Sequence, residues 1–586
     1  MADESHVVRG VNWRETFPFT QIFRAFRVAI HPTKLILALV ALIAIYAGGW
    51  LLDSLWPVQN RAIPRVVIDG KVVQQGEILE FANFDPQETK FDSFESYRKA
   101  QREQLEEGYA AKLMEMKIET DATAAKNAAK SGGDLGKVKD ELVKTRDKIV
   151  TDAKTAHDKA TETIKNDYDK ESKNAAADKQ ARLKEEKDKA IREQDDAYRN
   201  RVRAAYLEAK KRYDLASTIK GEGIFTQFFD YEKEQINNVS HAVLANDWLG
   251  GFSGNPGMRR PGVLASIQNF CVTGPWWMIR NHLAYFVLFV ILFSIIWAIF
   301  GGAICRIAAV HVARDEKLSL SAGLKFSTSK FLSFIFAPII PLVIVVVLGL
   351  IVMLGGLIGN IPVLGPALMG IFFFLALAAG FVMTLVLLGT GGGFNLMYPT
   401  IAVEGSDSFD AISRSFSYVY ARPWRMLFYT LVAIFYGALC YLFVRYFIAI
   451  MLLLTHHFVG AGMFVNVNGD VVPIDVWNTM WPAPSGQFTY DIDTMTLGPA
   501  QTFGAFLISI WVYLAVGMLG AFFISFYFSS NTIIYYLMRR EVDATELDDV
   551  YLEQSEEDFG DTTPVPPPSN PTPPVEPVTP ATPPAT

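Results

Sequence analysis

The sequence predicts an all-α integral membrane protein with about six transmembrane helices, a long extracytoplasmic insertion that forms a coiled coil or a helical hairpin, and a small β element. Three observations predict this fold class. Six segments are almost uninterrupted runs of apolar residues, each long enough to cross a bilayer core as a helix. A long intervening stretch is instead crowded with Lys, Glu, Asp and Ala. Lys and Arg recur in alternate links between the apolar segments.

The six apolar segments are the predicted transmembrane helices. They cover residues 34–52, 283–304, 331–357, 366–388, 427–454 and 503–529. An amphipathic segment, residues 1–33, precedes the first of them. Because the apolar core of this first helix is too long for a cleaved signal peptide, we expect it to be a retained anchor.

Lys and Arg set the predicted orientation of these helices. The links after the second, fourth and sixth helices carry basic residues, whereas the links after the third and fifth carry none. Because basic residues favour the cytoplasmic side of a membrane, both termini are predicted to be cytoplasmic. Residues 53–282 and the loop 455–502 are then extracytoplasmic.

The extracytoplasmic insertion divides into three parts. Residues 64–80 are predicted to form a β-hairpin, because Asp69-Gly70 separates two runs rich in Val and Ile, a pattern typical of a type I′ turn. Residues 92–218 form the predicted coiled coil. Residues 219–282 form a membrane-proximal part with several Phe and Trp residues.

The predicted coiled coil, residues 92–218, contains no proline, and Ser131-Gly132-Gly133 is its clearest break. We therefore expect two long helices, the second running from Lys137 to Thr218. Its apolar seam is thin and rich in Ala, which leaves two interpretations open. Either it forms a coiled coil, folded back on the first arm or paired with another chain, or it is a lone helix stabilised by Glu–Lys pairs at i,i+4. Few apolar side chains converge here, so the predicted role is reach or contact rather than catalysis.

Short amphipathic stretches precede the first, third and fifth predicted transmembrane helices. Residues 22–26 and 412–416 share the pattern Ile-x-Arg-x-Phe followed by a proline, and residues 324–326 are a looser version. We interpret these stretches as elbow helices at the inner membrane surface, with basic residues near anionic headgroups. The alternative is that any helix beside a membrane has this composition.

A run between the fourth and fifth predicted helices carries a family resemblance. Tyr398-Pro399-Thr-Ile-Ala-Val-Glu404-Gly405 is followed by Arg414 and by Arg422-Pro423-Trp424-Arg425. From about residue 300 to 455, the chain resembles uncharacterised bacterial multi-pass membrane families, including the membrane region of some glycerophosphodiester phosphodiesterases. The resemblance implies a helical domain in the cell inner (cytoplasmic) membrane. No phosphodiesterase domain is evident, so the resemblance implies no catalytic residue.

Arg445 is the candidate intramembrane charge, because it interrupts the fifth apolar segment. A charged side chain at the membrane centre costs about 2.5–3.5 kcal/mol on insertion scales, so a functional role is one interpretation. The alternative is that Arg445 lies near the outer end of the helix and extends its guanidinium to the membrane surface.

The loop that follows contains four candidate metal ligands, His456, His457, Asp491 and Asp493. Imidazole and carboxylate groups bind divalent metals, but the spacing matches no known metal motif, and an ordinary loop is the alternative. The sequence has no recognisable catalytic arrangement or cofactor fingerprint, so no catalytic residue and no cofactor is predicted. A net charge of −7 gives no support for nucleic-acid binding.

The C-terminal segment, residues 541–586, is predicted to be a disordered cytoplasmic tail. Its first part is acidic, and the part from Thr562 to Thr586 contains 11 prolines and no aromatic residue. This composition buries little apolar surface and favours an extended, polyproline-like chain.

The sequence supports three functional hypotheses in descending order. The first is a non-enzymatic membrane scaffold or envelope-interaction protein, with the lipid bilayer as one partner and a second copy or an envelope protein as another, through the coiled coil. The second is a transporter or channel-like component, which Arg445 favours. The third is a membrane enzyme, which depends on His456 and the loop after it.

Overall fold

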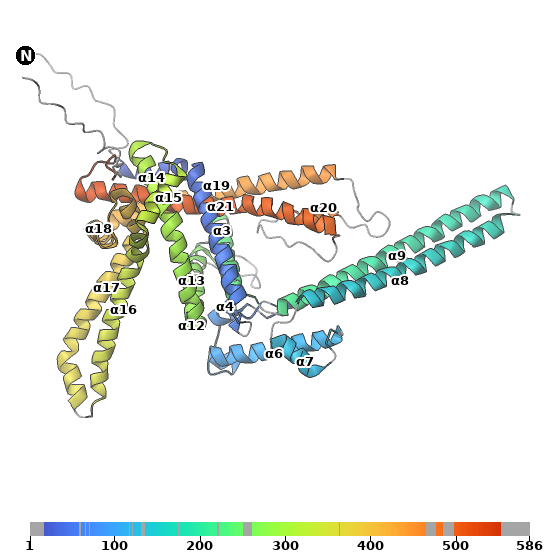
Figure 1. The fold of residues 1–586 in the computed structure, drawn as a ribbon, viewed down its shortest axis with the longest axis horizontal. Coiled ribbons are helices and arrows are strands. Elements are labelled where there is room, and N and C mark those ends of the chain that lie inside the picture. The colour runs from blue at the N-terminus through green and yellow to red at the C-terminus, as the bar shows by residue number, and fades with distance from the viewer. Residues whose placement is uncertain are drawn as a thin grey trace, which may run out of the picture.

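The computed structural model describes residues 17–551 with several short gaps, and Figure 1 shows its largely helical architecture. The segments outside the described residues are 58–59, 65, 69–70, 75, 117, 120, 131–134, 174–175, 220–221, 250–260, 363, 464–475, 485–496 and 498.

Six helical rods among the described residues are long and apolar enough to cross a membrane. They are α3 (Pro32–Leu55), the continuous rod of α13 (Leu283–Ile296), η4 (Trp297–Gly301) and α14 (Gly302–Arg314), α16 (Phe331–Leu357) with η5 (Ile358–Asn360), α17 (Leu364–Glu404), α19 (Pro423–Gly462) and α21 (Pro499–Asp543). The predicted number of long apolar helices and the helical membrane-type fold class are confirmed. Most of the rods extend beyond the predicted apolar spans, because polar residues continue the helices at their ends.

Three short helices precede α3, α16 and α19 at one common end of the molecule, which we call the elbow end. They are η1 (Pro18–Arg24) with α2 (Ala25–Ala29), α15 (Leu320–Ser329) and α18 (Ser408–Ala421). Pro32 and Pro423 occupy the first position of α3 and α19, where proline suits a helix start because its missing N–H has no partner to lose. These prolines help to separate each short helix from the long one that follows.

The largest buried cluster of the protein lies at the elbow end. Ile22 of η1 packs there with Leu396 of α17, Tyr418 of α18, and Tyr535 and Tyr536 of α21. Helices far apart in the sequence are therefore joined at this end. Away from it, the α16–α17 hairpin and the α19–α21 pair diverge (Figure 1). The most apolar window of α17 buries none of its residues within the protein, which leaves that stretch for lipid or another partner.

Between α3 and α13 lies the insertion, which contains short elements and one long hairpin. In chain order it contains β1 (Val66–Ile68), β2 (Lys71–Gln74), α4 (Glu77–Ala82), α5 (Pro86–Thr89), α6 (Phe94–Glu115), α7 (Ala122–Lys130), α8 (Leu135–Ser172), α9 (Ala177–Ile219), α10 (Ile224–Leu244), α11 (Val263–Gln268), η3 (Asn269–Thr273) and α12 (Gly274–Asn281). The two strands pair antiparallel, with Val67 opposite Val72. The turn residues Asp69 and Gly70 lie outside the described residues, so the type I′ turn stays a prediction. The other short helix, α20 (Val476–Met480), lies between α19 and α21.

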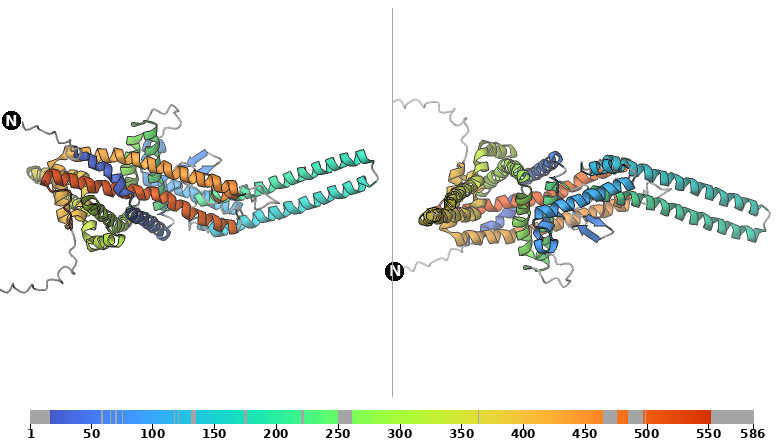
Figure 2. Two further views of the ribbon diagram at one scale, coloured as in Figure 1. Left: turned by 90° about the horizontal axis from the view of Figure 1, so that it is seen from above. Right: turned by 90° about the horizontal axis from the view of Figure 1, so that it is seen from below.

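Helices α8 and α9 lie side by side and project far from the rest of the molecule (Figures 1 and 2). The single long helix expected from Lys137 to Thr218 is therefore wrong: the chain reverses after Ser172, and the Gln180 side chain donates to the Ser172 carbonyl at 3.0 Å across the reversal. Folding back buries the thin seam within the chain, because Ala153 of α8 meets Tyr198 and Val202 of α9.

Candidate functional site

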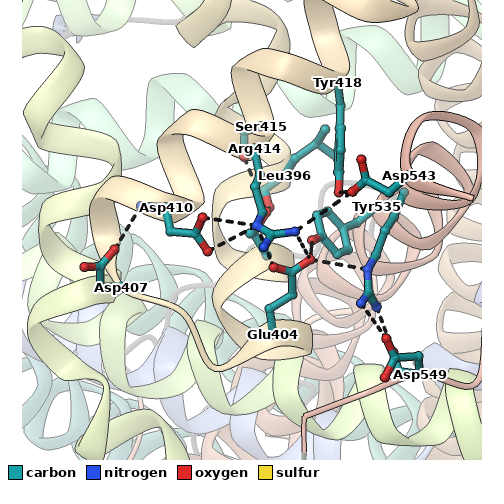
Figure 3. A network of polar contacts seen from close by, with 12 residues as sticks. Leu396, Glu404, Asp407, Asp410, Arg414, Ser415, Tyr418, Tyr535, Asp543 and Asp549 are labelled. Atoms are coloured by element: carbon teal, nitrogen blue, oxygen red, sulfur yellow. Dashed lines mark hydrogen bonds and ion pairs between the residues drawn. The ribbon is translucent and has the colours of Figure 1, made fainter. Parts of the chain in front are cut away.

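The carboxylate of Glu404, the last residue of α17, joins three helices at the elbow end (Figure 3). Arg414 of α18 approaches it with Nε 2.8 Å from Oε2 and Nη1 3.1 Å from Oε1. Arg539 of α21 forms an ion pair with Oε1 at 3.3 Å, and the Tyr535 hydroxyl of α21 donates to the same oxygen. The Glu404 side chain is 9% exposed, so these groups replace nearly all of its water.

The backbone between α17 and α18 explains how Glu404 and Arg414 meet. Gly405 has a φ of +65°, the left-handed conformation that ends helices and that glycine adopts without strain. Asp407 then caps α18 by accepting a hydrogen bond from the backbone N–H of Asp410 at 2.9 Å. This tight reversal directs Arg414, one turn further along α18, back over Glu404.

An outer ring of carboxylates surrounds the two arginines. Asp410 lies 3.1 Å from Arg414 Nε, Asp543 lies 3.9 Å from Arg414 Nη1, and Asp549 lies 2.7 Å from Arg539 Nη2. The Tyr418 hydroxyl donates to Asp543, and burial together with this hydrogen bond raises the pKa of Tyr418. Each carboxylate of the ring has an Arg or Tyr partner. The network therefore suits holding helices together rather than exchanging a ligand.

The chain after α21 returns to the same end and is pinned there. The Tyr551 N–H donates to the Val403 carbonyl at 2.8 Å, and buried Arg306 of α14 donates to the carbonyls of Ala402 at 2.8 Å and Tyr551 at 2.7 Å. The tail predicted to be disordered from residue 541 is therefore ordered as far as Tyr551. Val550 packs in the buried cluster, and this apolar contact stabilises the stretch despite its acidic composition. The remainder of the predicted tail, residues 552–586, lies outside the described residues.

The candidate intramembrane charge Arg445 is buried, 6% exposed, and lies against the insertion. Its Nη1 donates to the Asn237 side chain of α10 at 2.9 Å. The guanidinium therefore lies at a contact between α19 and the insertion, where it is hydrogen-bonded to protein.

Only part of the candidate metal set lies in the described residues. His456 Nε2 is 3.0 Å from the Trp481 carbonyl, an acceptor, and the His456 ring packs against Trp477 and Trp481. His457 packs beside its neighbour Phe458. Asp491 and Asp493 lie outside the described residues. Across the described part of the chain, no three His, Cys, Asp or Glu side chains are grouped as a metal site.

A second buried pair at the elbow end was not singled out from the sequence. Lys34 of α3 is fully buried, and its Nζ lies 3.2 Å from His311 Nδ1 of α14. The His31 ring stands edge-on to His311, and burial together with the charges of Lys34 and Lys317 lowers the pKa of His31. The sequence offers no signal for this pair, because Lys34 resembles an ordinary basic residue beside a membrane.

The insertion is joined to the ends of α3 and α13 by two buried carboxylates. Asp53 of α3 accepts hydrogen bonds from the backbone N–H groups of Phe225 at 2.9 Å and Thr226 at 3.0 Å, and from the Tyr285 hydroxyl at 2.7 Å. It therefore caps α10 from another helix. A Cβ on Gly223 would lie 1.9 Å from this carboxylate, so only glycine leaves room for the cap.

The second carboxylate is Glu77 of α4, which is fully buried. Arg98 of α6 lies 3.0 Å from it, His282 lies 3.2 Å from it, and the Trp277 indole N–H donates to it at 3.3 Å. Burial alone would raise the pKa of Glu77, but the hydrogen bond with His282 and the charge of Arg98 lower it below its usual value. A carboxylate held ionised here fixes α6 to the start of α13.

No protein-family model, curated protein or solved structure matches this chain.

Proposed function

We propose that this chain is a non-enzymatic membrane scaffold of the cell inner membrane, in which the long apolar helices anchor the α8–α9 hairpin and the hairpin contacts a partner away from the bilayer. Both termini would be cytoplasmic and the hairpin extracytoplasmic, as the basic residues favour. The observation that carries the proposal is that the distal part of the α8–α9 hairpin projects beyond the other described elements (Figure 2). With 43 residues, α9 extends about 65 Å at about 1.5 Å per residue.

The distal half of the hairpin, between His157 and Asp195, has an exposed and charged surface that is available for contact with a partner. Between His157 and Asp195, the described residues of α8 and α9 include none that is buried. Ion pairs such as Lys170–Asp167 are exposed, and exposed pairs contribute at most about 1 kcal/mol each. This part of the chain therefore lengthens the hairpin without contributing a hydrophobic core. Coiled-coil pairing with a second copy, or contact with an envelope protein, would give it a role.

The proximal half of the hairpin packs against α6, which fixes its position relative to the rest of the insertion. Tyr109 and Leu113 of α6 pack in one buried cluster with Leu142 of α8 and Ala209 of α9. Because Glu77 fixes α6 to α13, the hairpin is connected to the membrane helices through side chains as well as through the backbone. A scaffold needs such a connection to hold its partner at a defined distance.

Shortening the hairpin tests the proposal. His157 Nε2 and Asp195 Oδ1 are 2.7 Å apart, so deleting residues 158–194 and joining the ends with a short Gly-Ser turn preserves the proximal half. We expect the variant to insert and melt like the natural protein while losing specific crosslinks to its partner in intact cells.

A matched control keeps the length and net charge of the hairpin. The double change Lys170→Asp with Asp167→Lys reverses one exposed pair and should retain the crosslinks. If the shortened protein keeps the full set of crosslinks, the scaffold proposal is wrong.

A transporter or channel-like role is the second candidate, favoured by ionisable groups within the long apolar helices. Lys34, His311 and Arg445 are buried there, and such residues often mark ion or proton pathways. Reconstituted vesicles with an internal pH dye would test this role. Proton flux that disappears in His311→Asn but persists in the shortened hairpin variant would favour transport over scaffolding.

A further inference from the structure

A helical rod beside the start of α13 presents an apolar face that no other element in the described part of the chain covers. Helices α11, η3 and α12 are continuous from Val263 to Asn281, and we call them the 263–281 rod. From residue 263 to 279 the sequence contains no charged side chain. One face is buried, with Trp277 fully inside. The exposed face is apolar as well, with exposed fractions of 55% for Leu264, 44% for Ile267, 40% for Phe270, 54% for Val272 and 54% for Trp276.

This exposed face differs from the outer faces of the long helices α8 and α9. The outer faces of α8 and α9 are charged, as expected where a helix meets water. Contact with water therefore does not explain why the exposed face of the rod is apolar.

The rod and α10 lie at the depth of the membrane-helix ends. In α10, Phe225 packs over Gly49 and beside Tyr46 of α3, and Phe228 packs against Phe289 of α13 at 6.2 Å between ring centres. Phe289 lies about 9 Å along α13 from its first residue, at about 1.5 Å per residue. If α13 spans the membrane from its first residue, α10 therefore lies at the level of one headgroup layer, which adds several ångströms to the hydrocarbon core. The rod lies at the same level, because Asn269 donates to Gln235 of α10 at 3.5 Å and the rod leads directly into α13.

We propose that the 263–281 rod is an interfacial helix that rests in one surface of the lipid bilayer, with its exposed apolar face among the headgroups and upper acyl chains. The face continues into exposed apolar residues of α13, where Leu283, Val287 and Ile291 are 59%, 48% and 52% exposed. Exposed Trp276 and Arg280 lie at the junction, where an indole and a guanidinium suit the interface. This inference requires only that α13 spans a membrane, so it is independent of the scaffold role.

A natural thiol on the rod allows a direct test. Cys271 is exposed in η3, whereas Cys305 and Cys440 are buried. The full chain is labelled at Cys271 with a maleimide of a polarity-sensitive dye and reconstituted in phosphatidylcholine vesicles. Phosphatidylcholine carrying a doxyl quencher near its carbonyl groups should remove most of the fluorescence, and aqueous iodide should remove little.

A matched control moves the dye to the hairpin. In the Cys271→Ser, Thr163→Cys protein the label lies on exposed α8, so iodide should quench it and doxyl lipid should not. A labelling ratio of one dye per chain verifies that the buried thiols are unlabelled. Quenching at Cys271 by iodide alone would place the rod in water and overturn the proposal. Quenching by neither reagent would mean that protein, such as a second copy of this chain, covers the face, and would overturn it equally.

Discussion

At the residue scale, the elbow end depends on single carboxylates that serve several partners. Glu404 accepts from Arg414 and Tyr535 and pairs with Arg539, so one side chain connects α17, α18 and α21. Without the Glu404 charge, Arg414 and Arg539 would keep only the more exposed carboxylates of the ring as ion-pair partners, and removing one member of a buried ion pair is destabilising. Residues in this position should therefore tolerate substitution poorly.

Replacing Glu404 with Gln tests this dependence. We expect the variant to lose about 2–4 kcal/mol of unfolding free energy, because Arg539 and Arg414 lose their shared charge partner. Asp410→Asn is the matched control: its side chain is 42% exposed and contacts the same Arg414, so the loss should stay below about 1 kcal/mol. Thermal unfolding in detergent measures both. Equal losses would show that burial of Glu404 is not the deciding factor.

Glu232 of α10 gives the protein a dependence on pH. Its carboxyl oxygens have no hydrogen-bond partner among the described residues, and burial raises its pKa to about 8. The unfolded chain releases this proton near pH 4.5 and the folded chain near pH 8. In that interval the folded state binds more protons, so stability falls as pH rises.

The Glu232→Gln variant should remove that fall. Unfolding midpoints measured in detergent from pH 5 to pH 8.5 are expected to decline more steeply for the natural protein than for the variant, so that the variant is the more stable one at the alkaline end. A parallel decline in both proteins would assign the pH dependence to other groups.

Individual contacts were harder to predict from the sequence than the residues that make them. Glu404 and Arg414 both fall in the stretch with the family resemblance, yet nothing in that stretch indicates that they pair. Their third partner, Arg539, is 135 residues further along the chain than Glu404, and only the tertiary fold brings it near. His456, chosen as a possible ligand, instead holds the Trp481 carbonyl.

At the element scale, composition predicted the long apolar helices well because about 20 apolar residues in a row have few other solutions in a membrane protein. The charged region was harder. Its composition predicts helix strongly, and the reversal after Ser172 contains neither Gly nor Pro; Asn174 is the one turn-favouring residue and is a weak signal among many helix formers. The chain folds back because this buries a few residues such as Ala153 and Val202 against each other, which is a tertiary effect.

The middle of the α8–α9 hairpin should also respond to pH. His157 of α8 contacts Asp195 of α9 at 2.7 Å, and this hydrogen bond raises the pKa of His157 above its ordinary value of 6.5. A raised histidine pKa gives stability that is complete below pH 6.5 and is lost as pH rises through the folded value.

Hydrogen exchange of the full chain measures this effect. After correction for the intrinsic rate, amides around His157 and Tyr198 should exchange faster at pH 8.5 than at pH 6, and His157→Gln should remove the difference. Unchanged protection in the natural protein would show that the pair contributes little to the hairpin.

At the scale of the whole molecule, the long helices converge at the elbow end and separate beyond it. Within the most apolar 18-residue stretch of each helix, α17 buries 0% of its residues, whereas α3 buries 22% and α21 buries 28%. The sequence predicted how many helices there are, but hydropathy is similar for all of them and does not indicate which ones pack together.

A membrane-soluble carbene reagent should distinguish these helices. In vesicles we expect labelling over most of the apolar part of α17, sparing only the side that faces α16 in the hairpin, and labelling of a narrower face on α3 and α21. Peptide mass spectrometry locates the modified residues. Protection that extends beyond the side facing α16 would reveal another helix, such as one from a second copy, against α17.

The cap that Asp53 places on α10 also bears on how freely the insertion can vary in length. The chain leaves α3 at Asp53 and returns to the same carboxylate at Phe225, so the membrane helices already hold the two ends of the intervening segment together. Doubling the length of a loop whose ends are held costs only about 0.6 kcal/mol in closure entropy. Helical turns can therefore be added or removed at the tip of α8 and α9 without disturbing the anchor at Asp53.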